Sequence, residues 1–225
     1  MKKKILHVLN SSSYSGAENV VITIINNMND YYEFAYASKD GPINDVLSDQ
    51  GIKFLPLKKL SVYEMNRVIN NFKPDIIHAH DYTASIISAI SNIKIPVISH
   101  LHNNAPWIKT LHPYSFAHLC SSLKYKKILT VSNSILDEYV FGNYIRKKTV
   151  VISNPINVKE IYRKSTESDV NMNYDIVFLG RLSEPKNPLK FIELMRMVVD
   201  EFPSLKVAMI GDGILKNSCE KKLLN

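Results

Sequence analysis

The chain has 225 residues, of which 45% are hydrophobic and 22% charged, and it carries a formal net charge of +7. This length exceeds one domain of roughly 150 residues, and the composition is that of an ordinary globular protein, which excludes a fibrous or disordered chain. No apolar run is long enough to cross a membrane, and the run from Ile5 to Leu9 is too short for a signal peptide. Cys120 and Cys219 form no C-x-x-C pair, so we expect two buried, reduced thiols in a cytoplasmic protein.

Positive charge is gathered in four clusters, at 2–4, 58–59, 124–127 and 146–148. Each cluster alone is typical of a solvated surface. Together they favour an anionic partner, such as a phosphorylated ligand or an acidic membrane surface. No zinc-finger spacing or aromatic RNP pattern occurs, so we expect no nucleic acid partner.

Apolar runs of strand length alternate with segments of helical period along the first two thirds of the chain. The predicted strands are 4–10, 33–38, 53–57, 75–80, 96–102, 127–132 and 149–154, and the predicted helices are 17–28, 43–49, 61–72, 82–92, about 111–123 and 133–142. Several strands are apolar on both faces, which suits a parallel sheet covered by helices on each side. The pattern predicts an α/β fold, with a doubly wound, Rossmann-like domain over residues 1–154.

Two of the predicted helices begin with a Ser followed three residues later by a Glu. Ser15 with Glu18 and Ser61 with Glu64 have the spacing of capping boxes. We therefore expect Glu18 to secure a helix start, not to act as a catalytic acid.

A polar segment, 155–173, interrupts this alternation and is predicted to be an interdomain linker. A second β-α-β series follows it, with strands at 174–180 and 205–211 and a helix at 188–202. Residues 174–225 thus predict an incomplete second Rossmann-like domain, which further sequence or a second chain would complete, because a two-stranded sheet is marginal alone.

Polar side chains collect after the predicted strands, where ligands bind in open α/β sheets. His78 with His80, and His100 with His102, are two apart and therefore point to the same face of the sheet. One alternative is a metal-dependent hydrolase that uses these four histidines. No carboxylate or cysteine set accompanies them at motif spacing, so we expect no metal.

The stretch "GRLSEPKN" (180–187) places two cations, Arg181 and Lys186, in a turn before a helix. Cations oppose the dipole at a helix N-terminus, and a bound anion would relieve this conflict. The alternative is a helix-entry loop with two solvated cations and Asn187 as the cap.

Six blocks of the chain together resemble the retaining, nucleotide-sugar-dependent glycosyltransferases of family 4, which have the GT-B fold. The blocks are "SGAE" (15–18), "PDIIHAHD" (74–81), "ISHLHN" (98–103), "LTVSNS" (129–134), "VISNPIN" (151–157) and "GRLSEPKN" (180–187). The resemblance implies two Rossmann-like domains facing a cleft, with the acceptor on the N-terminal domain and the donor on the C-terminal one. It also implies no need for a divalent metal or other cofactor.

The same resemblance assigns roles to single residues. The positions that match the family's donor diphosphate site are Gly16, Arg181 and Lys186, and the histidine near the sugar matches His102. Asn154 and Glu184 are further candidates for the cleft.

The implied function is transfer of a sugar to a glycan or lipid-linked acceptor in capsule, lipopolysaccharide or exopolysaccharide biosynthesis. The family's E-x7-E motif would lie beyond Asn225, so the alternative is an inactive or binding-only remnant. We expect a cytoplasmic protein at the inner face of the membrane. Trp107, Tyr114 and Phe116 near the lysines of 124–127 suit docking on anionic lipid, although core packing is the simpler prediction for these aromatics.

Overall fold

The computed structural model describes residues 2–91, 94–167 and 173–224 and divides into two compact units. The first unit is Met1–Val158 and the second is Lys159–Asn225, and each is described by itself. The division falls inside the predicted linker, where helix α8 (Val158–Thr166) forms. Residues 168–172 of that linker lie outside the described residues.

The first unit is built on one six-stranded parallel sheet with the strand order β2-β1-β3-β4-β5-β6. The strands are β1 (Lys3–Val8), β2 (Tyr32–Ala37), β3 (Ile76–Ala79), β4 (Val97–Leu101), β5 (Tyr125–Thr130) and β6 (Thr149–Val151). This confirms the predicted α/β class and the parallel sheet.

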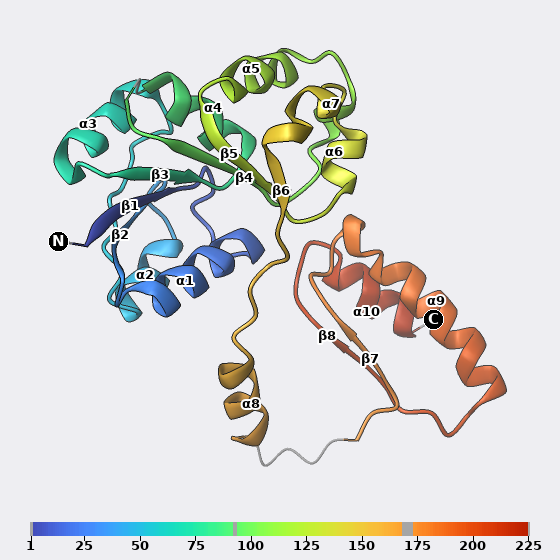
Figure 1. Cartoon of the computed structure of the whole chain (residues 1–225). Helices are drawn as coiled ribbons and strands as arrows, with labels where there is room; N and C mark the ends of the chain where they lie inside the picture. Colours follow the sequence, from blue (N-terminus) through green and yellow to red (C-terminus); the bar gives the residue numbers. More distant parts are fainter. Residues whose placement is uncertain (1, 92–93, 168–172, 225) are drawn as a thin grey trace. The chain divides into compact units, whose positions relative to one another are not determined.

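Helices cover both faces of this sheet, as Figure 1 shows. On one face, α1 (Gly16–Met28) and α2 (Ile43–Asp49) enclose a core with Phe34 and Tyr36. On the other, α3 (Val62–Phe72), α4 (Tyr82–Ser91) and α5 (Pro113–Ser122) enclose the larger core. Short helices follow at η1 (Pro106–Lys109), α6 (Ser134–Glu138), α7 (Gly142–Ile145) and η2 (Arg146–Lys148).

Two predicted elements of the first unit are wrong. Segment 53–57 makes only isolated bridges to Tyr36 and Lys39, because Pro56 has no N–H to extend a ladder. Helix 133–142 is divided into α6 and α7. Tyr139 leaves α6 with extended backbone, and a Cβ at Gly142 would lie 1.9 Å from the Leu136 carbonyl oxygen, so this close turn requires glycine.

Neither Ser-x-x-Glu pair forms the full capping box. The Ser61 hydroxyl accepts a hydrogen bond from the Glu64 amide at 3.4 Å, but the Glu64 carboxylate accepts from the Lys58 amide and from Arg67 instead. The Ser15 hydroxyl donates to the Glu18 carboxylate, so it does not cap the amides of α1. The burial prediction for cysteine holds for Cys219 and is wrong for Cys120, which is exposed.

The described residues of the second unit contain two parallel strands, β7 (Ile176–Leu179) and β8 (Val207–Ile210). After α8, the helical segments η3 (Glu184–Lys186), α9 (Pro188–Glu201) and α10 (Lys216–Leu224) accompany these strands. A cavity of about 410 Å³ lies against α9 and is lined by apolar side chains that include Ile192, Met195 and Met209. Of the helices in the described parts of the chain, none has the length and apolar character needed to span a bilayer.

Candidate functional site

The carboxyl ends of β1, β3 and β4 surround a cavity of about 160 Å³ in the first unit. Its lining comes from the segments that follow these three strands. The lining residues are Leu9, Ser11, Ser15, Ala17, Glu18, His80, Asp81, His102 and Asn103. This is the edge at which ligands bind in open α/β sheets, so the predicted position of the site agrees with the geometry.

Asp81 fixes the shape of this edge. Its two carboxylate oxygens accept hydrogen bonds from the Asn10 amide at 2.9 Å and from the Ala84 amide at 2.7 Å. The first bond holds the loop after β1, and the second caps the start of α4. Burial raises the pKa of the Asp81 carboxyl, against the effect of its backbone hydrogen bonds. Asp81 therefore has a structural task that the sequence analysis did not assign.

Glu18 is the acidic side chain of the cavity that the sequence analysis set aside. It is 2% exposed, and its carboxylate accepts a hydrogen bond from Ser15 in the turn before α1. The expectation that it only secures the helix start missed its place in the cavity lining. The helical periodicity of α1 was the available signal, because Glu18 lies one turn before the buried Val21 and Ile22.

Five histidines gather beneath this cavity on the face of the sheet that carries α1. Their rings come from three neighbouring strands: His7 from β1, His78 and His80 from β3 and its end, and His100 and His102 from β4 and its end. His7 and His78 are register partners, and each alternates with residues that belong to the core on the opposite face. Both H-x-H pairs thus point to the same face, as predicted.

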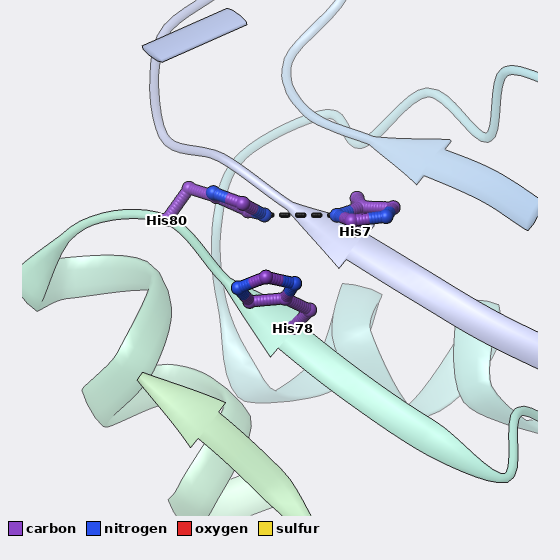
Figure 2. Close-up of side chains that lie close together, drawn as sticks. All are labelled: His7, His78 and His80. Atoms are coloured by element: carbon purple, nitrogen blue, oxygen red, sulfur yellow. Dashed lines mark hydrogen bonds between the residues drawn. The ribbon is translucent and has the colours of Figure 1, made fainter. Parts of the chain in front are cut away.

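Two hydrogen bonds join three of these rings into a chain. His7 Nδ1 lies 2.8 Å from His80 Nε2, and His80 Nδ1 lies 3.1 Å from His102 Nε2. Figure 2 shows the first of these contacts, with the His78 ring beside it. His80 is therefore the central member, and both of its nitrogens are occupied.

All five imidazoles are held in the neutral form. Burial, helped at His7 and His100 by the neighbouring histidines, lowers the pKa of His7 to about 3, of His100 to about 2 and of His102 to about 4. Burial and the adjacent rings also lower the pKa values of His78 and His80 well below the ordinary value. The site thus offers neutral hydrogen-bonding groups.

The histidines named in the alternative metal hypothesis do come together. One nitrogen from each of His80, His100 and His102 lies within 4.8 Å of the others, and the same holds for His7, His78 and His80. Two imidazole ligands of a tetrahedral zinc ion are about 3.3 Å apart, given Zn–N bonds of about 2.0–2.1 Å. The 2.8 Å and 3.1 Å contacts suit hydrogen bonds better, and a metal would have to break them.

Other predicted site residues of the first unit lie near His102 or the turn before α1. Asn154 acts to raise the pKa of His102, although burial outweighs this effect, and His102 Nδ1 has no hydrogen-bond partner of ordinary geometry among the described residues. At Gly16, a Cβ would have no heavy atom of the described residues within 4 Å, apart from its chain neighbours and its own helix backbone. The space above the first residue of α1 is therefore open.

The second unit holds the remaining predicted residues in the turn between β7 and α9. Arg181, Glu184 and Lys186 are all exposed. Within the described ranges, neither Arg181 nor Lys186 makes an ion pair or a side-chain hydrogen bond. Asn187 takes a left-handed conformation with φ 51°, and its side chain does not cap α9. The start of α9 therefore has two cations nearby that are unpaired within the described part of the chain, and it has no acidic residue in its first turn.

Residues 14–160 match the family model described as Glycosyltransferase Family 4. The chain is a member of Glycosyltransferase Family 4. This family member is 26% identical over 189 residues to a glycosyltransferase of Methanocaldococcus jannaschii, an alignment that covers 74% of the chain and 46% of that relative. The chain therefore spans about half the length of that curated relative.

Solved structures confirm the fold of this family member. The structure of Anabaena HepE in complex with UDP aligns with a TM-score of 0.77 at 18% identity, over 98% of the chain and 64% of HepE. The lipopolysaccharide outer core galactosyltransferase WaaB aligns with a TM-score of 0.62 at 16% identity, over 97% of the chain and 64% of WaaB. The match to these structures confirms the predicted GT-B-like architecture.

Proposed function

We propose that this member of the family transfers a sugar from a nucleotide-sugar donor, with retention, to a glycan or lipid-linked acceptor in surface polysaccharide biosynthesis. The observation that carries the proposal is the start of α9, where the exposed Arg181 and Lys186 have no ion-pair partner among the described residues and lie beside uncapped amides. These groups suit an anion with several oxygens, such as a diphosphate. HepE has been solved with UDP and with UDP-glucose, and WaaB is a lipopolysaccharide galactosyltransferase, which supports this donor and acceptor class.

The charge requirement of the reaction supports the same assignment. Sugar transfer passes through an oxocarbenium-like state while a nucleoside diphosphate departs, and fixed positive charge must meet the growing negative charge. Arg181, Lys186 and the amides of α9 supply it from the chain itself, so we propose that no divalent metal or other cofactor is needed. In the first unit, Gly16 leaves room for the donor phosphates, and His102, with Asn154 and Glu18 nearby, faces the reacting sugar. Glu184 remains a further candidate contact.

Titration calorimetry with UDP, GDP and their sugars tests this proposal. We expect one nucleotide or nucleotide-sugar to bind, and Arg181→Ala and Lys186→Ala each to weaken it about tenfold, since a hydrogen bond to a charged group contributes about 1.5–3 kcal/mol. Lys206→Ala is the matched control, because Lys206 is an exposed lysine at the opposite end of β8. Equal affinity in all variants would refute the diphosphate site.

The alternative function is that of an inactive or binding-only remnant. Absence of heat with every donor would favour an inactive chain, and binding without sugar transfer would favour a binding module. β7 and β8 expose Val177, Leu179 and Ile210, so we propose that further sequence or a second chain completes this unit. Elemental analysis addresses the remaining alternative, since stoichiometric zinc, iron or manganese would favour a metal-dependent hydrolase.

We also propose that the first unit docks on the anionic inner face of the cytoplasmic membrane. Trp107 packs against the core, but Tyr114 and Phe116 are each 54% exposed, and Leu111 nearby is exposed as well. Exposed aromatic and apolar side chains on a chain with a net charge of +7 suit the interface of an acidic bilayer. Pelleting with vesicles that contain or lack anionic lipid tests the idea, and equal, low binding to both would refute it.

A further inference from the structure

The cavity at the carboxyl ends of β1, β3 and β4 carries negative charge without a compensating cation. Glu18 and Asp81 line it, and neither forms an ion pair with a lysine or arginine of the described residues. No lysine or arginine of the described ranges lines the cavity, and its two histidines, His80 and His102, are neutral. The charge of Glu18 adds to burial in raising the pKa of the Asp81 carboxyl, so the two carboxylates interact.

These two carboxylates differ in how much of their hydrogen-bonding capacity is used. Asp81 accepts backbone hydrogen bonds at both of its oxygens. Glu18 accepts from the Ser15 hydroxyl at Oε2, and its Oε1 has no hydrogen-bond partner among the described residues. Although Glu18 as a whole is buried, Oε1 is not sealed from solvent. This oxygen is therefore an acceptor that the cavity offers to a ligand.

The size of the cavity limits what can reach this oxygen. Its volume of about 160 Å³ is below the roughly 300–1,000 Å³ of pockets that enclose a drug-sized ligand, so it holds only one small part of a ligand. Within the proposed function that part is a sugar ring, whose hydroxyl groups are hydrogen-bond donors. An acidic group on the ring would meet two carboxylates in a partly buried site, where like charges repel more strongly than in water.

We propose that Glu18 is a specificity-determining residue that admits uncharged sugars and excludes acidic ones. Glu18 Oε1 accepts a hydrogen bond from a hydroxyl group of the sugar. The charges of Glu18 and Asp81 repel a sugar that carries a carboxylate, sulfate or phosphate group. The restriction concerns the sugar alone, because the donor diphosphate has its own proposed cations at the start of α9. The inference rests on the proposed function, for which it names the class of sugar.

Pairs of nucleotide-sugars that differ only at C6 of the sugar test this inference by titration calorimetry. UDP-glucose is compared with UDP-glucuronate, and GDP-mannose with GDP-mannuronate. We expect the neutral member of a pair to bind at least about tenfold more tightly than its uronate, because the added carboxylate meets like charge in the cavity. Equal affinity for the two members, or a preference for the uronate, would overturn the proposal.

Glu18→Gln tests whether this side chain sets the preference, because it removes the charge and keeps the size and an acceptor oxygen. We expect the preference for the neutral sugar to fall to about threefold or less, since only the charge of Asp81 remains to repel the uronate. The matched control is Asp45→Asn, which removes an exposed acidic residue from the first turn of α2, outside the cavity lining, and should leave the preference unchanged. A folded Glu18→Gln protein with the full preference would refute the role of Glu18.

If no nucleotide-sugar binds, the proposed function is refuted, and free sugars then test the cavity by itself. Glucose, mannose and their uronates are added to the unsubstituted full chain, labelled with ¹⁵N-histidine, at equal ionic strength. The NMR signals of His102 are identified by their loss in His102→Gln. We expect glucose or mannose to shift these signals and neither uronate to do so, which would leave the assignment of the cavity in place. Shifts with both kinds of sugar, or with neither, would overturn it together with the proposed function.

Discussion

Acidification from pH 6 to pH 5 should unfold the first unit, because six histidines, five buried and one partly buried, are held there in the neutral form. They are the five of the cluster and His118, whose pKa burial lowers to about 3. In the unfolded chain each histidine takes up a proton near pH 6.5. In the folded unit the pKa values of His7, His100, His102 and His118 are about 4 or lower, and burial holds those of His78 and His80 well below the ordinary value. The unfolded state thus binds more protons in this interval, so stability falls as the pH falls.

The size of this effect follows from the linkage relation. Each histidine that stays neutral only in the folded state lowers the free energy of unfolding by about 1.2 kcal/mol between pH 6 and pH 5. Six such groups together lower it by about 7 kcal/mol, which is comparable to the whole stability of a typical domain. The raised pKa of the Asp81 carboxyl acts in the opposite direction, but it is a single group set against six histidines.

Urea denaturation followed by tryptophan fluorescence measures how the free energy of unfolding of the first unit changes with pH, because the only tryptophan of the sequence, Trp107, packs in this unit. We expect the free energy of unfolding to fall steeply below pH 6 and to approach zero near pH 5. His100→Leu removes a ring with no partner among the described residues on either nitrogen, and should reduce the fall by about one sixth. A free energy that changes by less than about 1 kcal/mol from pH 7 to pH 5 would refute the reasoning.

Three substitutions test other parts of the first unit. Gly16→Ala should leave the free energy of unfolding unchanged or raise it by up to about 1 kcal/mol, because the space around Gly16 is open. The same substitution should weaken donor binding in calorimetry. A large loss of stability would contradict the open space found there. Gly142→Ala should lower the free energy of unfolding by about 1–3 kcal/mol, because the new Cβ overlaps the Leu136 carbonyl. Thermal unfolding measures this, and a melting temperature equal to that of the unsubstituted chain would contradict the prediction. Asp81→Asn should lower the free energy of unfolding, measured by urea denaturation, by about 1–3 kcal/mol, because one of two accepting oxygens is lost. The control Asp49→Asn, at an exposed position, should leave this free energy unchanged.

Most of the fold could be predicted because the spacing of apolar residues indicates which face of each helix or strand is buried. Helix α2 occupies the predicted residues, and α1, α3 and α4 lie within one residue of theirs. The division of α6 from α7 could not be predicted in the same way. It depends on the approach of Gly142 to the Leu136 carbonyl, a contact that no apolar pattern encodes.

The candidate site was predictable in position but not in its connections. Alternation placed His78 with His80 and His100 with His102 on common faces, as the structure confirms. The pairing of His7 with His78 depends on the register between β1 and β3, which a single sequence does not specify. His7 was therefore missed, although its alternation with Leu6 and Val8 already indicated the face that it occupies.

The first unit offers neutral histidine side chains and the second offers cations, and this contrast matches the two parts of the proposed donor, the sugar and the diphosphate. The site of the first unit offers neutral imidazoles, and the free cations of the second unit lie at the start of α9. A sugar is uncharged, so neutral donors and acceptors can bind its hydroxyls without the cost of burying a charge. A departing nucleoside diphosphate gains negative charge and needs cations at that point. If the histidines were protonated at neutral pH, this contrast would disappear, so their neutrality is a requirement of the proposed assignment and not only a consequence of burial.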